Sequence, residues 1–287
     1  MRVLDLFSGI GGFALGIICA EYGYLFEPSQ FVEIDNFCQR VLTERFPTVP
    51  IHPDIKTFHA EPHSFDVICA SPPCPPFSMA GKQKASADER NLFPEVMRLI
   101  KQVQPLGVLI ENVPGILSAE KGEFFRNILN QFAEMGYDCE WGCISVEALG
   151  GVHKRERVFI TAYPSSEYKH GNRMGKTKAW STTALNPTTK YPAWAEGVRR
   201  ICGEHVGVSS RMDECLMTKI SANQTTKHWN YKEYKPRLKA LGNSICPQQA
   251  AIAWQKLYEN LYKWQTSPLV QTPNQSTQKT SSTGEPP

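Results

Sequence analysis

Short apolar runs alternate with longer segments of helical spacing along the first 160 residues of the chain. The apolar runs indicate buried strands over 3–6, 31–33, 67–69, 108–110 and 158–160. The longer segments predict helices over 12–19, 36–45, 92–103 and 122–135. Strands and helices in this order are typical of an α/β fold with a doubly wound, mostly parallel sheet. Ligands of such sheets bind beyond the carboxyl ends of the strands, near the point where the strand order reverses.

The alternation ends near residue 163, and the chain divides into unlike parts. After a main domain over 1–162, residues 163–235 are dominated by Ser, Thr, Lys, Asn, Gly and Trp, which predicts a small, loop-rich second domain. Residues 236–264 regain helical spacing and are expected to return to the main domain. Residues 265–287 are rich in Ser, Thr, Pro and Gln, so we expect a disordered tail.

Composition narrows the class of protein. The chain is 41% hydrophobic and 21% charged, and it has no apolar stretch near the roughly 18 to 20 residues of a membrane span. No signal-peptide pattern follows Met1, and the nine cysteines form no CxxC pair, which argues against a disulfide framework and a zinc site. We therefore expect a cytoplasmic protein that neither associates with a membrane nor binds a metal.

Charge is distributed unevenly along the chain. Residues 1–150 carry 11 Lys and Arg against 19 Asp and Glu, whereas residues 151–240 carry 17 against 7. A basic segment of this kind is typical of a surface that faces a polyanion. A solvated, lysine-rich surface explains the same charge equally well.

Residues 5–16, DLFSGIGGFALG, combine a strand end with three glycines directly before a helix. Glycines let the backbone turn sharply and approach a ligand, and a new helix presents free N–H groups. Glu33 lies 22 residues beyond Gly11 at the end of the second strand, where a carboxylate can accept hydrogen bonds from ribose hydroxyls. The pattern indicates a nucleotide-like cofactor, and it fits a nicotinamide or flavin as well as S-adenosylmethionine. A tight turn without a ligand is the alternative.

Residues 71–78, SPPCPPFS, place Cys74 between two proline pairs directly after an apolar run. Because proline fixes φ and lacks an N–H, the loop is stiff and cannot join the sheet. We expect it to hold the Cys74 sulfur at the carboxyl edge of the sheet, near the glycine turn. A lone cysteine is more often a small buried residue, and we expect this of Cys19, Cys38, Cys69 and Cys139.

Two further motifs bring charged groups to strand ends. Glu111 follows the apolar run 107–110, where burial raises the pKa of a carboxyl toward the range of a proton donor. A structural carboxylate bonded to backbone N–H groups is the alternative. In HKRER, residues 153–157, strand alternation places Arg155 and Arg157 on one face. A guanidinium there can orient the carboxylate or grip phosphate, although a solvated basic edge is the default.

Taken together, these motifs resemble those of the DNA cytosine-5 methyltransferase family, in particular its small bacterial and phage-type members. The matching blocks follow the family's order and cover most of 3–162 and 236–254. They read DLFSGIGGFALG, FVEID, PDI, SPPCPPFSMAGKQK, ENVPG, GGVHKRERVFI and KALGNSICPQQAAIAW. The resemblance implies the Rossmann-like fold of S-adenosylmethionine-dependent methyltransferases, with 163–235 as the target-recognition region.

The chemistry implied by the resemblance is methyl transfer from S-adenosylmethionine to C5 of a cytosine flipped out of double-stranded DNA, which leaves S-adenosylhomocysteine. The Cys74 thiolate would add to C6 of the base and make C5 nucleophilic, while Glu111 would protonate or hydrogen-bond N3. Arg155 and Arg157 match the family's paired arginines, which support Glu111, the flipped base and the DNA backbone.

The resemblance also assigns binding residues. The loop after Cys74 would close over the DNA through Ser78, Lys82, Lys84 and Arg90. The residues that match the family's cofactor side are Phe7, Gly9, Ile10, Gly11, Gly12, Glu33, Asp54, Ile55, Pro73, Asn243 and Ser244.

Three other interpretations fit part of the sequence. A NAD- or FAD-binding oxidoreductase shares the glycine turn but does not explain the remaining motifs in this order. A tRNA cytosine methyltransferase on the same scaffold and a catalytically inactive DNA-binding relative are the others. For the DNA enzyme we expect a monomer in a bacterial or phage-infected cell, with a cognate restriction endonuclease as a candidate partner.

Overall fold

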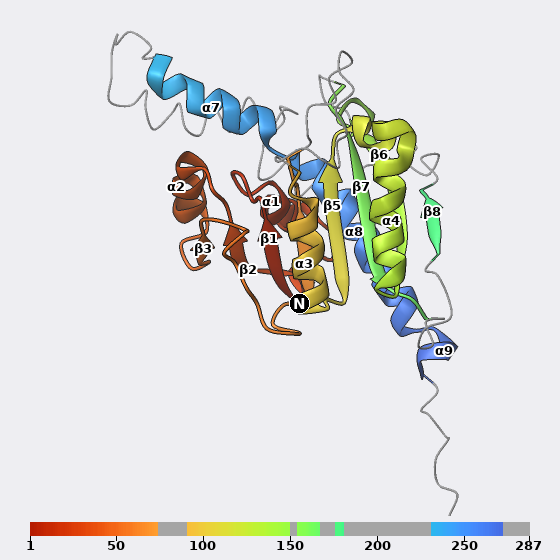
Figure 1. The fold of residues 1–287 in the computed structure, drawn as a ribbon. Helices are drawn as coiled ribbons and strands as arrows, with labels where there is room; N and C mark the ends of the chain where they lie inside the picture. Colours follow the sequence, from red (N-terminus) through yellow and green to blue (C-terminus); the bar gives the residue numbers. More distant parts are fainter. Residues whose placement is uncertain (74–90, 150–153, 167–175, 181–230, 272–287) are drawn as a thin grey trace, which may run out of the picture.

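The computed structural model describes residues 1–73, 91–149, 154–166, 176–180 and 231–271. These residues form one eight-stranded sheet, in the order β3-β2-β1-β4-β5-β7-β6-β8, with helices on both faces (Figure 1). The strands are β1 Arg2–Leu6, β2 Glu27–Val32, β3 Ile51–His52, β4 Val67–Ala70, β5 Gly107–Asn112, β6 Tyr137–Ser145, β7 Glu156–Pro164 and β8 Thr177–Ala179.

Strand direction determines where ligands can bind. The strands β3, β2, β1, β4 and β5 are parallel, whereas β7 is antiparallel to both β5 and β6. The chain moves outward from β1 to β3 and then crosses back to β4, so the strand order reverses between β1 and β4. In doubly wound sheets this reversal opens the crevice in which ligands bind. Because β7 is antiparallel, its first residues lie beside the last residues of β5.

Local sequence explains where several helices begin. The Asp35 carboxylate accepts the backbone N–H groups of Phe37 and Cys38, which is the N-cap arrangement for α2. Helix α8 begins at Pro247. Proline suits this position because the N–H groups of a first turn have no acceptor within the helix, so its missing N–H loses no hydrogen bond. The helices are α1 Gly12–Cys19, α2 Asn36–Arg45, α3 Phe93–Val103, α4 Glu123–Glu134, α7 Tyr231–Asn243, α8 Pro247–Gln265 and α9 Pro268–Gln271, with 3₁₀ helices at Gly23–Leu25, Pro114–Leu117, Ala119–Gly122 and Glu147–Leu149.

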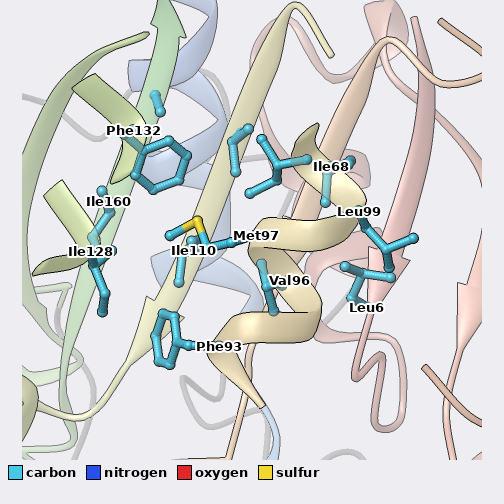
Figure 2. Packing of buried hydrophobic residues seen from close by; sticks show 14 of the residues in the cluster. Leu6, Ile68, Phe93, Val96, Met97, Leu99, Ile110, Ile128, Phe132 and Ile160 are labelled. Atoms are coloured by element: carbon cyan, nitrogen blue, oxygen red, sulfur yellow. The ribbon is translucent and has the colours of Figure 1, made fainter. Parts of the chain in front are cut away.

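Two apolar layers hold the helices on the sheet. Helices α3 and α4 cover one face, where Leu99 and Phe132 pack with Ile110 of β5 (Figure 2). Helices α1 and α8 cover the other face, where Trp254 is fully buried and its Nε1 donates to the carbonyl of Phe13 at 3.1 Å. Each large apolar side chain buried in this way contributes about 1.5–3 kcal/mol. The layers therefore hold the strand ends that carry the candidate site.

The predicted alternation of strands and helices is confirmed. Each strand and helix expected within 1–160 is present, and the helical spacing predicted over 236–264 corresponds to the end of α7 and to α8, which extends to Gln265. The sheet is mostly parallel, as predicted. The cysteines expected to be small buried residues are buried, namely Cys19, Cys38, Cys69 and Cys139.

The structure also contains elements that the sequence did not predict. Strands β3 and β6 belong to the main sheet, and β8, within the segment 163–235, pairs with β6. Helix α7 begins before residue 236, and the short helix α9 lies in the segment that we expected to be disordered. The remainder of 163–235, and residues 272–287, lie outside the described residues, so the domain boundaries stay predictions. No helix in the described ranges is long and apolar enough to cross a membrane.

Candidate active site at the carboxyl edge of the sheet

Five chain segments meet at the carboxyl edge of the sheet. The glycine loop follows β1, Glu33 follows β2 and Ser71 follows β4. Glu111 is the fifth residue of β5 and pairs across the ladder with β7. Because β7 is antiparallel, Arg157 at its beginning lies at this same edge.

The glycine loop takes a backbone conformation that side chains disfavour. Gly9 and Gly11 have φ values of +55° and +89°, in the left-handed region. A Cβ at Gly11 would lie 2.8 Å from the ring of Phe46, whereas a Cβ at Gly9 would meet nothing within 4 Å. Gly11 therefore lets the loop pack against the Phe46 ring beyond α2, and Gly9 leaves space beside the backbone.

Glu33 connects this loop to the second strand. Its Oε2 accepts the N–H of Gly9 and its Oε1 accepts the N–H of Asp35, both at 2.7 Å. The residue is 8% exposed, and burial raises the pKa of the carboxyl although the backbone N–H donors oppose that shift. A carboxylate oxygen has capacity for a second hydrogen bond. Glu33 is thus held in one orientation and can still accept from a ligand.

The residues of this loop fit the predicted S-adenosylmethionine. A ribose offers two neighbouring hydroxyls, which match the carboxylate that Gly9 and Asp35 hold in place. Helix α1 begins after Gly11 without a side-chain cap, so its first N–H groups can donate to a polar ligand. The open side of Gly9 allows that ligand to approach the backbone.

Three other residues predicted on the cofactor side have constrained side chains. Ile10 and Ile55 are 4% and 5% exposed and pack in apolar clusters, so they can offer mainly backbone groups to a ligand. The Asp54 carboxylate accepts the backbone N–H of Lys56 at 2.9 Å, which orients it. Sequence matching alone did not distinguish these backbone roles from side-chain roles.

The return segment packs directly on the glycine loop. A Cβ at Gly12 would come within 2.8 Å of the Ile245 side chain, so only glycine allows this approach. Ile245 follows Asn243 and Ser244, which the sequence placed on the cofactor side. Lys239 of α7 forms an ion pair with Asp35 at 3.0 Å. The structure thus brings the end of α7 beside the residues that follow Glu33.

The base of the Cys74 loop is anchored at the same edge. The Ser71 N–H donates to the carbonyl of Leu6 at 3.2 Å, and its hydroxyl donates to the carbonyl of Phe7 at 3.3 Å. From β5, the buried Asn112 donates its side-chain amide to the carbonyl of Pro72 at 3.1 Å. Pro73 is exposed and ends the described part of this loop.

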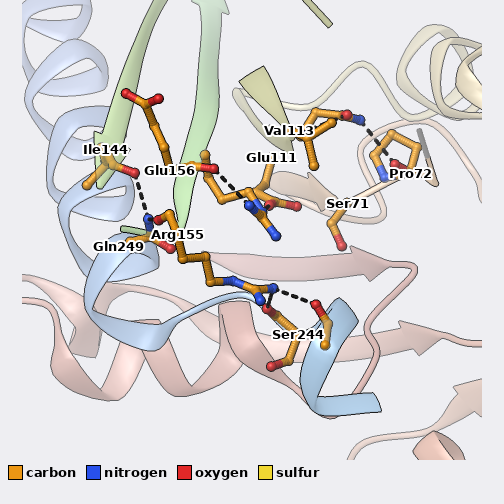
Figure 3. A network of polar contacts seen from close by, with 12 residues as sticks. Ser71, Pro72, Glu111, Val113, Ile144, Arg155, Glu156, Ser244 and Gln249 are labelled. Carbon is orange, nitrogen blue, oxygen red and sulfur yellow. Dashed lines mark hydrogen bonds and ion pairs between the residues drawn. The ribbon is translucent and has the colours of Figure 1, made fainter. Parts of the chain in front are cut away.

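Glu111 forms a buried ion pair with Arg157 (Figure 3). Arg157 Nε lies 2.8 Å from Glu111 Oε1, and the two side chains are 16% and 9% exposed. Burial raises the pKa of Glu111 to about 7, against the opposing charges of Arg157 and Arg155. The predicted elevation at this strand end is therefore confirmed, and the carboxyl can donate or accept a proton near neutral pH.

Arg155 makes different contacts from Arg157. Its Nη2 donates to the carbonyl of Gly242 at 2.9 Å and to the carbonyl of Ser244 (Figure 3). Its Nε is buried and has no hydrogen-bond partner among the described residues. Among the described residues, Arg157 forms the ion pair with Glu111 and Arg155 bonds the return segment, so the two arginines predicted on one face make different contacts.

Several predicted residues lie outside the described part of the chain, namely Cys74, Ser78, Lys82, Lys84 and Arg90. Conversely, sequence reasoning did not single out Asn112, Lys239 or Gln249, which make contacts at this edge. Asn112 was detectable as the neighbour of Glu111 in a strand-end motif. Lys239 and Gln249 lie within the matched block KALGNSICPQQAAIAW, but no local pattern indicated their contacts, since their partners lie far away along the chain.

Comparison with known proteins agrees with this arrangement. The family described as C-5 cytosine-specific DNA methylase matches residues 1–286. The chain belongs to this family. This match over nearly the whole chain confirms the resemblance that the sequence motifs indicated.

Individual members of the methylase family match about half of the chain or more. A Type II methyltransferase of Neisseria gonorrhoeae, M.NgoMIV, is 35% identical over 161 residues, which is 55% of this chain and 50% of that protein. M.BsuFI of Bacillus subtilis is 33% identical over 196 residues, covering 66% of this chain and 47% of the relative. The chain spans about half the length of these curated relatives.

Two methyltransferases are among the solved structures that match the chain. An E. coli prophage protein, described as a DNA modification methyltransferase, is 28% identical with a TM-score of 0.48, covering 61% of this chain and 51% of that one. The Entamoeba histolytica methyltransferase EhMeth is 20% identical with a TM-score of 0.48, covering 62% of this chain and 57% of that one.

Proposed function

We propose that this methylase-family member transfers a methyl group from S-adenosylmethionine to C5 of a cytosine in double-stranded DNA. The observation that carries the proposal is the buried Glu111–Arg157 pair, which lies at the sheet edge where the base of the Cys74 loop is anchored. A carboxyl with a pKa of about 7 at this position suits an acid that must give and take one proton.

In this reaction the Cys74 thiolate adds to C6 of the cytosine, and Glu111 gives its proton to N3, so the charge of the addition does not accumulate on the ring. C5 then has enamine character and takes the methyl group, which S-adenosylmethionine supplies as an electrophile. A base removes the C5 proton, the Cys74–C6 bond breaks, and the N3 proton returns to Glu111. Arg157 holds the Glu111 carboxyl in one orientation during both transfers.

The substrate base must leave the helix before this chemistry can begin. C6 and N3 of a paired cytosine are covered by stacking and pairing, so a rigid protein edge cannot reach them inside a duplex. The basic segment 151–240, with 17 Lys and Arg against 7 Asp and Glu, supports phosphate contact during that step. A monomeric state and a cognate restriction endonuclease stay predictions.

The proposal is tested by incubating the purified protein with radiolabelled S-adenosylmethionine and either plasmid DNA or a tRNA pool. We expect label in the DNA, with 5-methylcytosine as the product after nucleoside digestion and bisulfite sequencing to locate it. Labelling of tRNA alone would favour the tRNA enzyme, and labelling of neither would contradict both.

Cofactor identity gives a separate prediction. At about 100 times its dissociation constant, S-adenosylhomocysteine is expected to add roughly 2.7 kcal/mol to the unfolding free energy and to raise the melting temperature. NAD is expected to leave the melting temperature unchanged. The reverse pattern, or flavin absorbance in the purified protein, would support an oxidoreductase instead.

Glu33 is expected to matter for cofactor affinity. In Glu33→Gln one of the two oxygens becomes an NH₂ group that faces the N–H of Gly9 or of Asp35, so the loop loses a charge-assisted bond. We expect the dissociation constant for S-adenosylhomocysteine to rise about tenfold or more, as measured by calorimetry. Glu61→Gln, at an exposed carboxylate, is the matched control and should leave the constant unchanged. Equal constants for Glu33→Gln and wild type would contradict the ribose role.

A further inference from the structure

Gln249 is a fully buried polar residue in the first turn of α8. Its Nε2 donates to the carbonyl of Ile144 at 2.6 Å and to the carbonyl of Arg155 at 2.8 Å (Figure 3). Two carbonyl acceptors determine the orientation of the amide, because the reversed group would place its oxygen against both of them. Gln249 thereby bonds the end of β6 and the residue before β7 at once.

Arg155 makes the reverse connection. Its side chain donates to the carbonyls of Gly242 and Ser244, which precede α8, while its own carbonyl accepts from the Gln249 side chain. The segment before β7 donates its Arg155 side chain to the backbone that precedes α8, and α8 donates its Gln249 side chain to the backbone of Arg155. We name this arrangement the Arg155–Gln249 clamp. It joins the cofactor-side turn to the beginning of the strand that carries Arg157.

The position of the clamp along β7 has consequences for the site. Ile144 is the ladder partner of Arg157, so the clamp fixes the backbone two residues before that arginine and the backbone directly across the ladder from it. At the other end of the interface, Asn260 of α8 donates to the hydroxyl of Thr161 at 3.2 Å. Both residues join α8 to the β6–β7 region through a buried side-chain amide, but Gln249 is the one beside the Glu111–Arg157 pair.

We propose that Gln249 is a positioning residue, which holds Arg155 and Arg157 in register with the cofactor-side turn and so keeps Arg157 on Glu111. The proposal rests on the proposed function for its effect on turnover. Gln249 touches neither substrate nor cofactor in this scheme and acts through the two arginines. The residue also gives the protein a direct connection between its methyl-donor side and its base side.

The test compares Gln249→Met with Asn260→Leu. Each variant replaces a buried amide by an apolar side chain of similar size; Gln249→Met removes two hydrogen bonds from α8 to the sheet, and Asn260→Leu removes one. We expect Gln249→Met to lower kcat about 10- to 100-fold with a smaller change in the KM for S-adenosylmethionine, as small misplacements of catalytic groups do. Asn260→Leu should lower the melting temperature but retain kcat.

A second measurement does not depend on turnover. In protein labelled with ¹³C-carboxyl glutamate, the Glu111 resonance is assigned by its loss in Glu111→Gln and titrated in each variant. When Arg157 shifts away, the Glu111 pKa is expected to rise above its wild-type value in Gln249→Met and to stay unchanged in Asn260→Leu. Equal titrations in wild type and Gln249→Met would overturn the positioning role.

The two readouts separate the two proposals. A wild-type protein without methyl transfer, but with the titration shift in Gln249→Met, would refute the proposed function and retain the positioning role. Normal methyl transfer by the wild type, together with an unchanged Glu111 titration in Gln249→Met, would retain the proposed function and refute the positioning role. If Gln249→Met melts too low to measure, Gln249→Asn keeps an amide but withdraws it by one methylene, and we expect a smaller shift of the same sign.

Discussion

Methyl transfer is expected to fall by at least about 1000-fold when Cys74 is replaced by alanine, because the proposed activation of C5 depends on the addition of this thiolate to C6. The residues that lead into the loop support this role: Ser71 bonds the end of β1, and Asn112 bonds Pro72 beside Glu111. A nucleophile at the residue after Pro73 would therefore follow a segment that hydrogen bonds hold in place. The measurement is the initial rate of label transfer to DNA.

A covalent adduct provides the sharper readout for Cys74. DNA that contains 5-fluorocytosine cannot lose its C5 substituent, so the wild-type protein is expected to stay bound to it on a denaturing gel. Cys74→Ala should form no adduct and yet bind S-adenosylhomocysteine normally. Cys143→Ala, at a partly buried thiol of β6, is the matched control and should retain the adduct. An adduct in Cys74→Ala would assign the nucleophile elsewhere.

The second large effect is expected at Glu111. Glu111→Gln keeps the shape of the side chain but cannot give a proton to N3, so we expect kcat to fall about 100-fold or more. The pKa of Glu111 is about 7 because burial outweighs the nearby arginines, and the acid form is lost as the pH rises. In wild type, kcat should therefore decline above about pH 7, and this decline should be absent from the residual activity of Glu111→Gln. An identical pH profile in both proteins would exclude Glu111 as the acid.

The same carboxyl affects stability with a defined sign. Its pKa is raised in the folded protein, from 4.5 to about 7, so the folded state holds a proton that the unfolded state has released within this interval. The contribution is complete below the unfolded value and is lost as the pH rises through the folded one. Wild type should thus lose up to about 3 kcal/mol relative to Glu111→Gln between pH 4.5 and 7, measured by urea unfolding.

The fold was predictable where the chain follows one repeated rule. Buried parallel strands read as short apolar runs, and helices such as α4 place their apolar residues on one face. Strand β6 does not follow that rule, since its residues alternate between buried and half-buried and include Asp138 and Glu140. The antiparallel direction of β7 was also not predictable, because apolar alternation is the same in both directions.

The candidate site was predictable as a set of motifs but not as a set of contacts. Glu111 and its raised pKa followed from a carboxyl at the end of a buried strand. Strand alternation placed Arg155 and Arg157 on one face, but only the register against β5 and the path of the return segment decide which one pairs with Glu111. Gln249 is 94 residues from Arg155 in the chain, and no local pattern indicates such a contact.

The packing of α1 against α8 has a consequence for protein synthesis. Gly12 and Gly16 of the first motif are made well before Ile245 and Ala250, which cover them. A nascent chain therefore holds the ligand-binding motif without the partner that shapes it until α8 has been made. Contacts between such distant parts also slow folding, so methyl-donor binding is expected only after α8 has left the ribosome.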